Sequence, residues 1–142
     1  MAMNKSRLAL LLLLTFFTTA TAQHLIQPQN KNALEKADVL YNTRRYDEAR
    51  AELQRVIDDE PTNAEAFWLL GRINQQTHDH ENAVAAYQTA IFWEPHLIDT
   101  YISVVRILLT RNKRSEAKKY IERALAIDPA NQEVLALRKL SR

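Results

Sequence analysis

Apolar side chains recur along most of the chain at spacings of three and four residues, and short polar segments separate the runs. In the middle of the chain, Phe67, Leu70 and Gly71 follow Asn63, a residue type that caps helices well. After a polar break, a second run places apolar side chains on one face: Ala83, Tyr87, Ala90 and Ile91. This period indicates two amphipathic helices. The second should end at the residue before Pro95, because that residue is pushed out of helical geometry.

The pattern returns with a fixed period of 34 residues. Pro61, Pro95 and Pro129 stand at that spacing, and each follows an acidic residue. The same register aligns three sets of apolar residues: Ala49, Ala83 and Ala117; Leu53, Tyr87 and Ile121; Ile57, Ile91 and Leu125. We therefore expect three units of two helices each, at about 30–63, 64–97 and 98–131. Neither helix of a unit can bury its stripe alone, so the units must stack and share one core.

A further helix is expected after the third unit. The C-terminal segment carries four apolar residues at helical spacing: Val134, Leu135, Leu137 and Leu140. One capping helix over 132–141 would cover the core that the third unit leaves exposed, as terminal repeats must. The expected fold is therefore all-α, with seven helices.

The middle unit resembles the tetratricopeptide repeat (TPR). The residues that match the pattern of this family are Phe67, Leu70, Gly71, Ala83, Tyr87 and Pro95. The resemblance implies a right-handed superhelical solenoid of three antiparallel helix pairs plus the capping helix. The chain departs from the pattern at Asn74, where the family has Tyr, at Ala33, where a large aromatic is usual, and at Val105, which replaces the small residue Gly71. We expect Val105 to make the third helix pair slightly wider.

The resemblance also implies a peptide-binding groove lined by the first helix of each pair. Carried over by position, the groove residues are Leu34, Asp38, Tyr41 and Asn42 from the first repeat, Glu65, Trp68, Arg72 and Gln75 from the second, and Asp99, Ile102, Arg106 and Leu109 from the third. Trp68 is the expected anchor, and Arg72 and Arg106 could receive a carboxylate. The alternative is that Arg72 pairs with Asp38 or Glu65 inside the protein and Trp68 packs on its neighbours.

Cytosolic adaptors of this family clamp a C-terminal carboxylate with Lys and Asn on the groove helix of the first repeat. Leu34 and Asp38 hold those positions here, and Asp38 would repel such a ligand. We therefore do not expect that mode of binding.

Two neighbouring aromatic residues lie at the end of the second unit. Trp93 occupies the repeat position of Ile127, which predicts packing toward the next repeat. Phe92 occupies the position of Asp58 and Ala126, on the face turned away from the groove. We expect Phe92 to form a contact on the convex surface.

Catalytic chemistry has little support in the sequence. The chain has no cysteine and one glycine, and it has no phosphate-binding loop. His78 and His80 are the local candidates for a metal site, but metal-binding histidines on a helix usually stand four residues apart. His78 also aligns with Arg44 and Asn112 in a tight turn, where left-handed backbone geometry is expected. We expect no enzyme activity, no cofactor and no bound metal.

The N-terminus has the pattern of a secretory signal peptide. Lys5 and Arg7 precede the apolar run Leu8–Phe17, and a small-x-small motif ends at Ala22. We expect a cleavable signal over 1–22, a short linker over 23–29 and the repeat domain over 30–142. The alternative is a retained anchor, but a membrane-spanning helix needs about 20 apolar residues. This organisation predicts a periplasmic or secreted protein, with bacterial export and without stable membrane insertion after cleavage.

The charge distribution adds one alternative. Without the signal, 17 basic residues balance 17 acidic ones, so the basic pI does not indicate a nucleic-acid partner. Residues 23–97 hold 7 basic and 12 acidic residues, whereas residues 98–142 hold 10 basic and 5 acidic. The leading interpretation is a non-catalytic adaptor or scaffold that binds a protein or peptide partner of the cell envelope, or a secreted one, in its groove. The alternative is a homo-oligomer that assembles head to tail through its acidic and basic ends.

Overall fold

The computed structural model of the protein describes residues 29–142. The expected signal peptide, 1–22, and linker positions 23–28 lie outside the described residues. Residue 29, expected at the end of the linker, already belongs to the first described helix, which spans residues 29–42.

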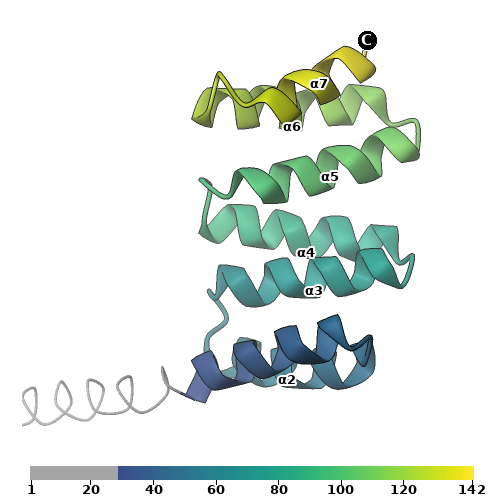
Figure 1. Cartoon of the computed structure of the whole chain (residues 1–142). Coiled ribbons are helices and arrows are strands. Elements are labelled where there is room, and N and C mark those ends of the chain that lie inside the picture. Colours follow the sequence, from purple (N-terminus) through teal and green to yellow (C-terminus); the bar gives the residue numbers. More distant parts are fainter. Residues whose placement is uncertain (1–28) are drawn as a thin grey trace, which may run out of the picture.

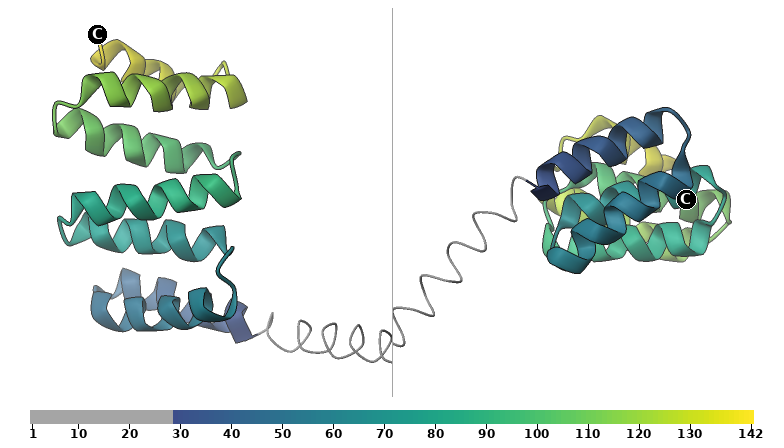
Figure 2. Two further views of the ribbon diagram at one scale, coloured as in Figure 1. Left: turned by 180° about the vertical axis from the view of Figure 1, so that it is seen from behind. Right: turned by 90° about the horizontal axis from the view of Figure 1, so that it is seen from below.

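Six further helices follow this first one, and all of them lie in one continuous stack. They are α2 (Tyr46–Asp59), α3 (Ala64–Gln76), α4 (His80–Trp93), α5 (Ile98–Thr110), α6 (Arg114–Ile127) and α7 (Gln132–Leu140). Figure 1 shows them ascending from the helix over 29–42 and α2 to α7, and the left view in Figure 2 shows the same stack from behind. Residues 29–142 contain no strand, so the expected all-α fold of seven helices is confirmed.

Local capping explains where several helices begin. The Asn63 side chain accepts a hydrogen bond from the Ala66 amide at 2.9 Å, and Asn131 does the same for Val134 at 3.1 Å. These bonds satisfy amides that the helix itself leaves without a partner. The expected N-cap at Asn63 is therefore confirmed.

The turns inside the three helix pairs share one backbone geometry. Arg44, His78 and Asn112 have φ angles of 60°, 61° and 58°. All three lie in the left-handed region, which side chains other than Gly seldom adopt. The expected turn role of His78 is confirmed. The rings of His78 and His80 lie 6.1 Å apart, and residues 29–142 contain no group of three or more potential ligand side chains placed to hold a metal ion.

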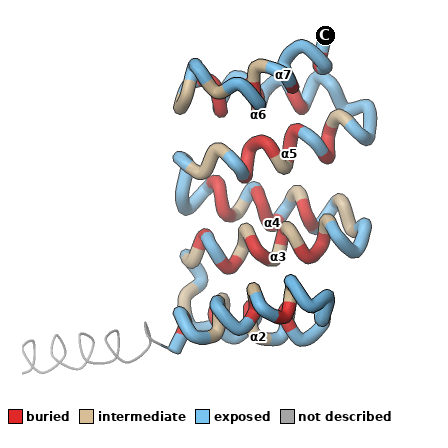
Figure 3. Tube along the Cα trace, in the orientation of Figure 1, coloured by how far each residue is buried: buried red, intermediate tan, exposed pale blue. Residues whose placement is uncertain are grey.

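Buried residues, red along the backbone in Figure 3, recur in the helices throughout the stack. One cluster joins the first helix pair to α3, and a larger one runs from α4 to α7. Trp68 packs against both clusters from the middle of α3. Stacking therefore buries one face of each repeat against the next, as a repeat fold requires.

In the stretch from residue 29 to residue 142, no helix combines the length and the apolar content needed to cross a bilayer.

The closest approach within the middle helix pair depends on Gly71. A Cβ atom at this position would lie only 2.6 Å from Cδ1 and Cε1 of Tyr87, whose side chain is fully buried. The aromatic ring of α4 therefore occupies the space that a larger residue on α3 would need.

The other two repeats have different residues at the positions equivalent to Gly71 and Tyr87. The first uses Ala37 with Leu53, and the third uses Val105 with Ile121, all four at most 1% exposed. In each pair, a residue smaller than Tyr87 on the second helix leaves room for a residue larger than Gly71 on the first. The expectation that Val105 makes the third helix pair slightly wider stays a prediction.

The capping helix differs from expectation at one residue. Val134 and Leu137 are buried and Leu135 packs against the core, but Leu140 is 66% exposed. The expectation that Leu140 covers the core is wrong. Leu140 is the last residue of α7, and the chain turns there so that Ser141 is buried instead.

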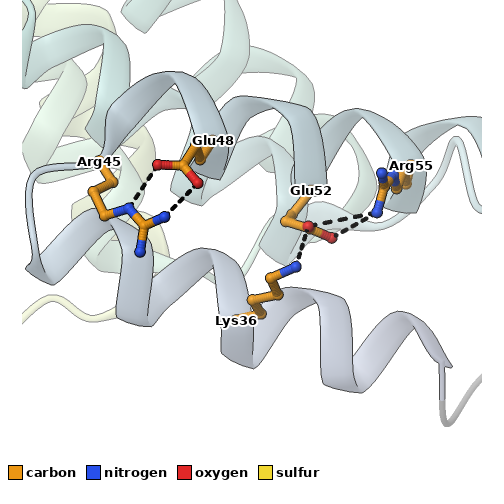
Figure 4. Close-up of polar contacts among 5 residues, drawn as sticks. All are labelled: Lys36, Arg45, Glu48, Glu52 and Arg55. Carbon is orange, nitrogen blue, oxygen red and sulfur yellow. Dashed lines mark hydrogen bonds and ion pairs between the residues drawn. The ribbon is translucent and has the colours of Figure 1, made fainter.

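Ion pairs fasten the first helix pair, as Figure 4 shows. Lys36 on the first helix donates to Glu52 on α2 at 2.6 Å, and Arg55 lies 3.4 Å from the same carboxylate. The hydrogen bond from Lys36 lowers the pKa of Glu52. Arg45 and Glu48 form a second pair at the start of α2, and that hydrogen bond lowers the pKa of Glu48. Both carboxylates therefore stay charged to lower pH than an isolated glutamate.

We predict that Gly71 and Tyr87 are energetically coupled. Gly71→Val should cost about 1–3 kcal/mol because the new side chain meets the buried ring. Tyr87→Ile should cost about 2 kcal/mol or more because it leaves a cavity. The double variant reproduces the pair found at Val105 and Ile121, so it should cost at least about 1 kcal/mol less than the sum. Urea unfolding of the four proteins measures this coupling, and additive costs would refute it.

Candidate binding groove

The first helices of all three repeats contribute to one hollow, which we call the central hollow. Its volume is about 190 Å³. Its walls are formed by Tyr41, Trp68, Arg72, Gln75, Gln76, Tyr87, Asp99, Ser103 and Arg106. Six of the residues expected in the groove thus lie together: Tyr41, Trp68, Arg72, Gln75, Asp99 and Arg106. The stacking of the repeats brings them together from helices that are distant in the sequence.

Arg72 is held in place by its neighbours in the central hollow. Its guanidinium carbon lies 4.2 Å from the ring centroid of Tyr41 and 4.7 Å from that of Trp68. Its Nη1 also lies 3.6 Å from the Asp38 carboxylate, which is an ion pair longer than a hydrogen bond. Each cation–π contact contributes about 0.5–1 kcal/mol at an exposed site. The internal pairing of Arg72 with Asp38, which the sequence left open, is therefore present.

Arg106 occupies the matching position in the third repeat, but it turns the other way along the stack. Its Nη2 lies 2.6 Å from Oε1 of Glu133 on α7. Both arginines thus have acidic partners inside the protein. An incoming carboxylate would have to displace one of them.

The floor of the central hollow contains a side chain that the sequence assigned to the core. The Tyr87 hydroxyl donates a hydrogen bond to Oε1 of Gln75 at 2.9 Å. Burial raises the pKa of Tyr87 to about 12, while Ser103 and Arg72 oppose that shift. The hydroxyl therefore remains protonated at neutral pH. The repeat pattern identifies the buried ring of Tyr87, but it gives no signal that the hydroxyl reaches the groove.

A second hollow lies beside the first, and we call it the acidic hollow. Its volume is about 470 Å³. Its lining residues are Glu65, Trp68, Glu94, His96, Leu97, Ile98, Asp99 and Thr100. Trp68 and Asp99 line both hollows. Glu94 and His96 come from the connection between α4 and α5, which the groove pattern of the family does not include, so sequence reasoning missed them.

The remaining expected groove residues have other surroundings. Asn42 donates to the Asp38 carboxylate at 3.0 Å, beside Arg72. Leu34 and Leu109 are half-buried and pack against the two core clusters. Ile102 is only 7% exposed, so the expectation that it faces the groove is wrong. Its side chain packs into the core at the position where Trp68 stands in the repeat before it.

The aromatic pair at the end of α4 lies at the surface. Phe92 is 72% exposed and Trp93 is 42% exposed, and their rings meet edge to face with centroids 4.9 Å apart. The expectation that Trp93 packs in the core is wrong. At the matching position, Ile127 does pack against the core, whereas Trp93 ends its helix against the ring of Phe92. Contact of Phe92 with a partner stays a prediction.

We predict that Phe92→Ser changes the free energy of unfolding by less than about 1 kcal/mol, because only the contact with Trp93 is lost. Ile91→Ala, one residue earlier and 2% exposed, should cost about 2–5 kcal/mol. Thermal or urea unfolding of the two variants measures the difference. A loss for Phe92→Ser as large as that for Ile91→Ala would show that Phe92 is part of the core.

Comparisons with known proteins agree with this architecture. A sequence model of the tetratricopeptide repeat matches residues 34–95, and a second one matches residues 98–131. The chain is 29% identical over 109 residues to the uncharacterized protein ycf37 of Cyanophora paradoxa. That match covers 74% of this chain, which spans only 62% of the length of ycf37.

Solved structures of similar fold include two repeat domains with bound peptides. The first TPR of Spaghetti (RPAP3), bound to the HSP90 peptide SRMEEVD, has a TM-score of 0.71 at 24% identity, over 80% of this chain and 90% of the other. The second TPR domain of human RPAP3, in complex with the HSP70 peptide SGPTIEEVD, has a TM-score of 0.73 at 18% identity, over 82% and 98%. These likenesses concern the fold. Together the two family matches cover more than half of the sequence, and the chain belongs to the tetratricopeptide repeat family.

Proposed function

We propose that this protein is a non-catalytic adaptor that holds a segment of a protein partner in the groove formed by its first helices. The observation that carries the proposal is the central hollow, to which three separate repeats contribute side chains. Trp68 and Arg72 are already held by their neighbours there, so little side-chain freedom remains to be lost on binding. Aromatic residues and arginines placed in this way often dominate the energy of an interface.

The peptide-bound relatives support the same proposal. Two repeat domains of the same fold hold the HSP90 peptide SRMEEVD and the HSP70 peptide SGPTIEEVD. A peptide partner is therefore a use that this architecture allows. Asp38, on the groove helix of the first repeat, makes those particular peptides poor candidates here, because the carboxylate would repel their acidic ends.

We further propose that the adaptor works outside the cytoplasm, in a bacterial periplasm or after secretion. The support is the sequence of the N-terminus, with Lys5 and Arg7 before the run Leu8–Phe17 and a small-x-small motif ending at Ala22. A partner would then belong to the cell envelope or be secreted. The absence of cysteine means that no disulfide is needed for this protein to fold in an oxidising compartment.

We expect Trp68→Ala to weaken capture of the partner at least about thirtyfold, because truncation of a central anchor typically costs about 2 kcal/mol or more. A photo-crosslinking residue at Ser103, in the central hollow, should label the same partner in an envelope fraction. Mass spectrometry of the crosslinked peptide identifies the bound segment. The same photo-crosslinking residue placed at Lys119, which is exposed on α6, serves as the matched control.

As a control for folding, circular dichroism should show the same helicity for the wild type and for Trp68→Ala. Equal capture by the wild type and Trp68→Ala, or labelling from Lys119 but not from Ser103, would contradict binding in the groove.

A further inference from the structure

The acidic hollow contains three carboxylates that have no partner inside the described protein. Glu65, Glu94 and Asp99 line it, and none of them forms a side-chain ion pair or hydrogen bond with another residue of 29–142. No lysine or arginine is among the lining residues, and His96 supplies the only basic side chain.

Glu94 lacks a hydrogen-bond donor that the other repeats provide. At the matching positions, Asn63 donates to Glu60 at 2.9 Å, and Asn131 donates to Asp128 at 3.4 Å. In the middle repeat, Leu97 stands at the position of these asparagines. Leu97 has no polar group, so it can neither bind the Glu94 carboxylate nor cap α5.

Asp99 lacks the cation that its position normally meets. The matching residue in the next repeat, Glu133, pairs with Arg106 at 2.6 Å. The equivalent arginine for Asp99 is Arg72, but that side chain turns toward Asp38 in the first repeat. The Asp99 carboxylate is therefore left without an ion-pair partner among residues 29–142.

Glu65 lacks a cationic partner, because an acidic residue holds the position where the pairing arginine would stand. One repeat earlier, the position that corresponds to Arg72 is held by Asp38. Asp38 has the same charge as Glu65 and cannot pair with it, and Asp38 is itself engaged with Arg72 and Asn42. Leu97 in place of asparagine, Asp38 in place of arginine, and the pairing of Arg72 with Asp38 thus leave three carboxylates without a partner around one hollow.

The N-terminus of α5 lies at the same hollow and opposes these charges. Its amides are not capped by the Leu97 side chain, so the helix dipole contributes about half of one positive charge there. Three carboxylates outweigh that contribution. The net potential in the hollow is negative, and it favours a cation.

Trp68 supplies the second element of recognition. Its indole lines the acidic hollow and already contacts the guanidinium of Arg72 at 4.7 Å. The apolar side chains of Leu97 and Ile98 offer a surface for the hydrocarbon stem of a long basic side chain. A planar guanidinium fits a combination of carboxylates and an aromatic ring better than an ammonium does.

We propose that the acidic hollow binds an arginine or lysine side chain of the partner segment, with arginine preferred. This inference rests on the proposed function, since it names the chemistry of the residue that the groove selects. The opposite charge, a carboxylate on the partner, would meet Glu65, Glu94 and Asp99 unpaired, while Arg72 and Arg106 are already engaged.

Small probes test the proposal on the full 142-residue chain without knowledge of the partner. We would titrate Nα-acetyl-arginine N-methylamide, the matching lysine and glutamate compounds, and the norleucine compound, which has the stem of lysine without its charge. The readout is the indole N–H resonance of Trp68 at pH 8 and low salt, with Trp93 as the internal reference. The arginine probe should bind about three- to tenfold more tightly than the norleucine probe, and this preference should fall at about 0.5 M salt.

Two variants connect the effect to the hollow. Asp99→Asn removes one charge, and Leu97→Asn restores the donor found at Asn63 and Asn131, which should occupy Glu94 while leaving α5 better capped. Each should weaken binding of the arginine probe about threefold or more. Glu122→Gln, an exposed carboxylate on α6, is the matched control and should leave binding unchanged.

Three results would overturn the proposal: equal binding of the arginine and norleucine probes, tighter binding of the glutamate probe, or a Trp68 resonance that shifts with protein concentration before any probe is added. The last result would assign the hollow to a basic segment of a second copy. Failure here is distinct from failure of the proposed function. Capture of the partner that depends on Trp68 but not on Asp99 or Glu65 would keep the groove and reject only its preference for a cation.

Discussion

The contact between the ring of Tyr87 and the backbone of Gly71 is the constraint on which the groove depends. The ring lies so close to α3 that a Cβ atom on Gly71 would overlap it. This contact sets the separation of α3 and α4, while the hydroxyl of the same residue reaches Gln75 at the floor of the central hollow. The side chain of Tyr87 thus sets the spacing of α3 and α4 and also forms part of the lining of the central hollow. The positions of Trp68 and Arg72 follow, because both are carried by α3.

Much of the fold could be predicted from the sequence. The period of 34 residues depends on backbone geometry and on which positions must be apolar, and both can be recognised without knowing any contact. The turn at His78 is an example, since a shared slot with Arg44 and Asn112 is enough to expect the left-handed geometry that all three adopt. Half of the expected groove residues also lie around the central hollow, because a helix of fixed period presents the same positions in every repeat.

The predictions from sequence that were wrong concern side chains whose surroundings depend on neighbours outside the repeat pattern. Ile102 was expected in the groove because its position matches Trp68, yet an aliphatic side chain there sinks into the core. Trp93 was expected in the core because its position matches Ile127, yet its ring meets exposed Phe92 edge to face. In both cases the position is equivalent, while the size and polarity of the residue decide where the side chain goes. A repeat register predicts backbone positions better than it predicts burial.

Choice of ionic partner is the feature that the sequence could least predict. Arg72 and Arg106 occupy equivalent positions, but one pairs toward the N-terminus of the stack and the other toward the C-terminus. The difference arises because Tyr41 and Trp68 offer Arg72 two aromatic faces near Asp38. The turn of that single side chain leaves Asp99 without a cation. It thereby converts an ordinary repeat junction into a negatively charged hollow beside an indole.

The central claim is that the segment held in the groove covers Trp68, which lines both hollows, and does not reach Trp93, which lines neither. Hydroxyl-radical footprinting of the protein alone and with its captured partner compares these two tryptophans directly, because each gives a separate oxidised peptide. We expect oxidation of Trp68 to fall several-fold in the complex while oxidation of Trp93 is unchanged. Protection of Trp93 with no change at Trp68 would contradict the claim and would place the interface at the exposed aromatic pair Phe92 and Trp93.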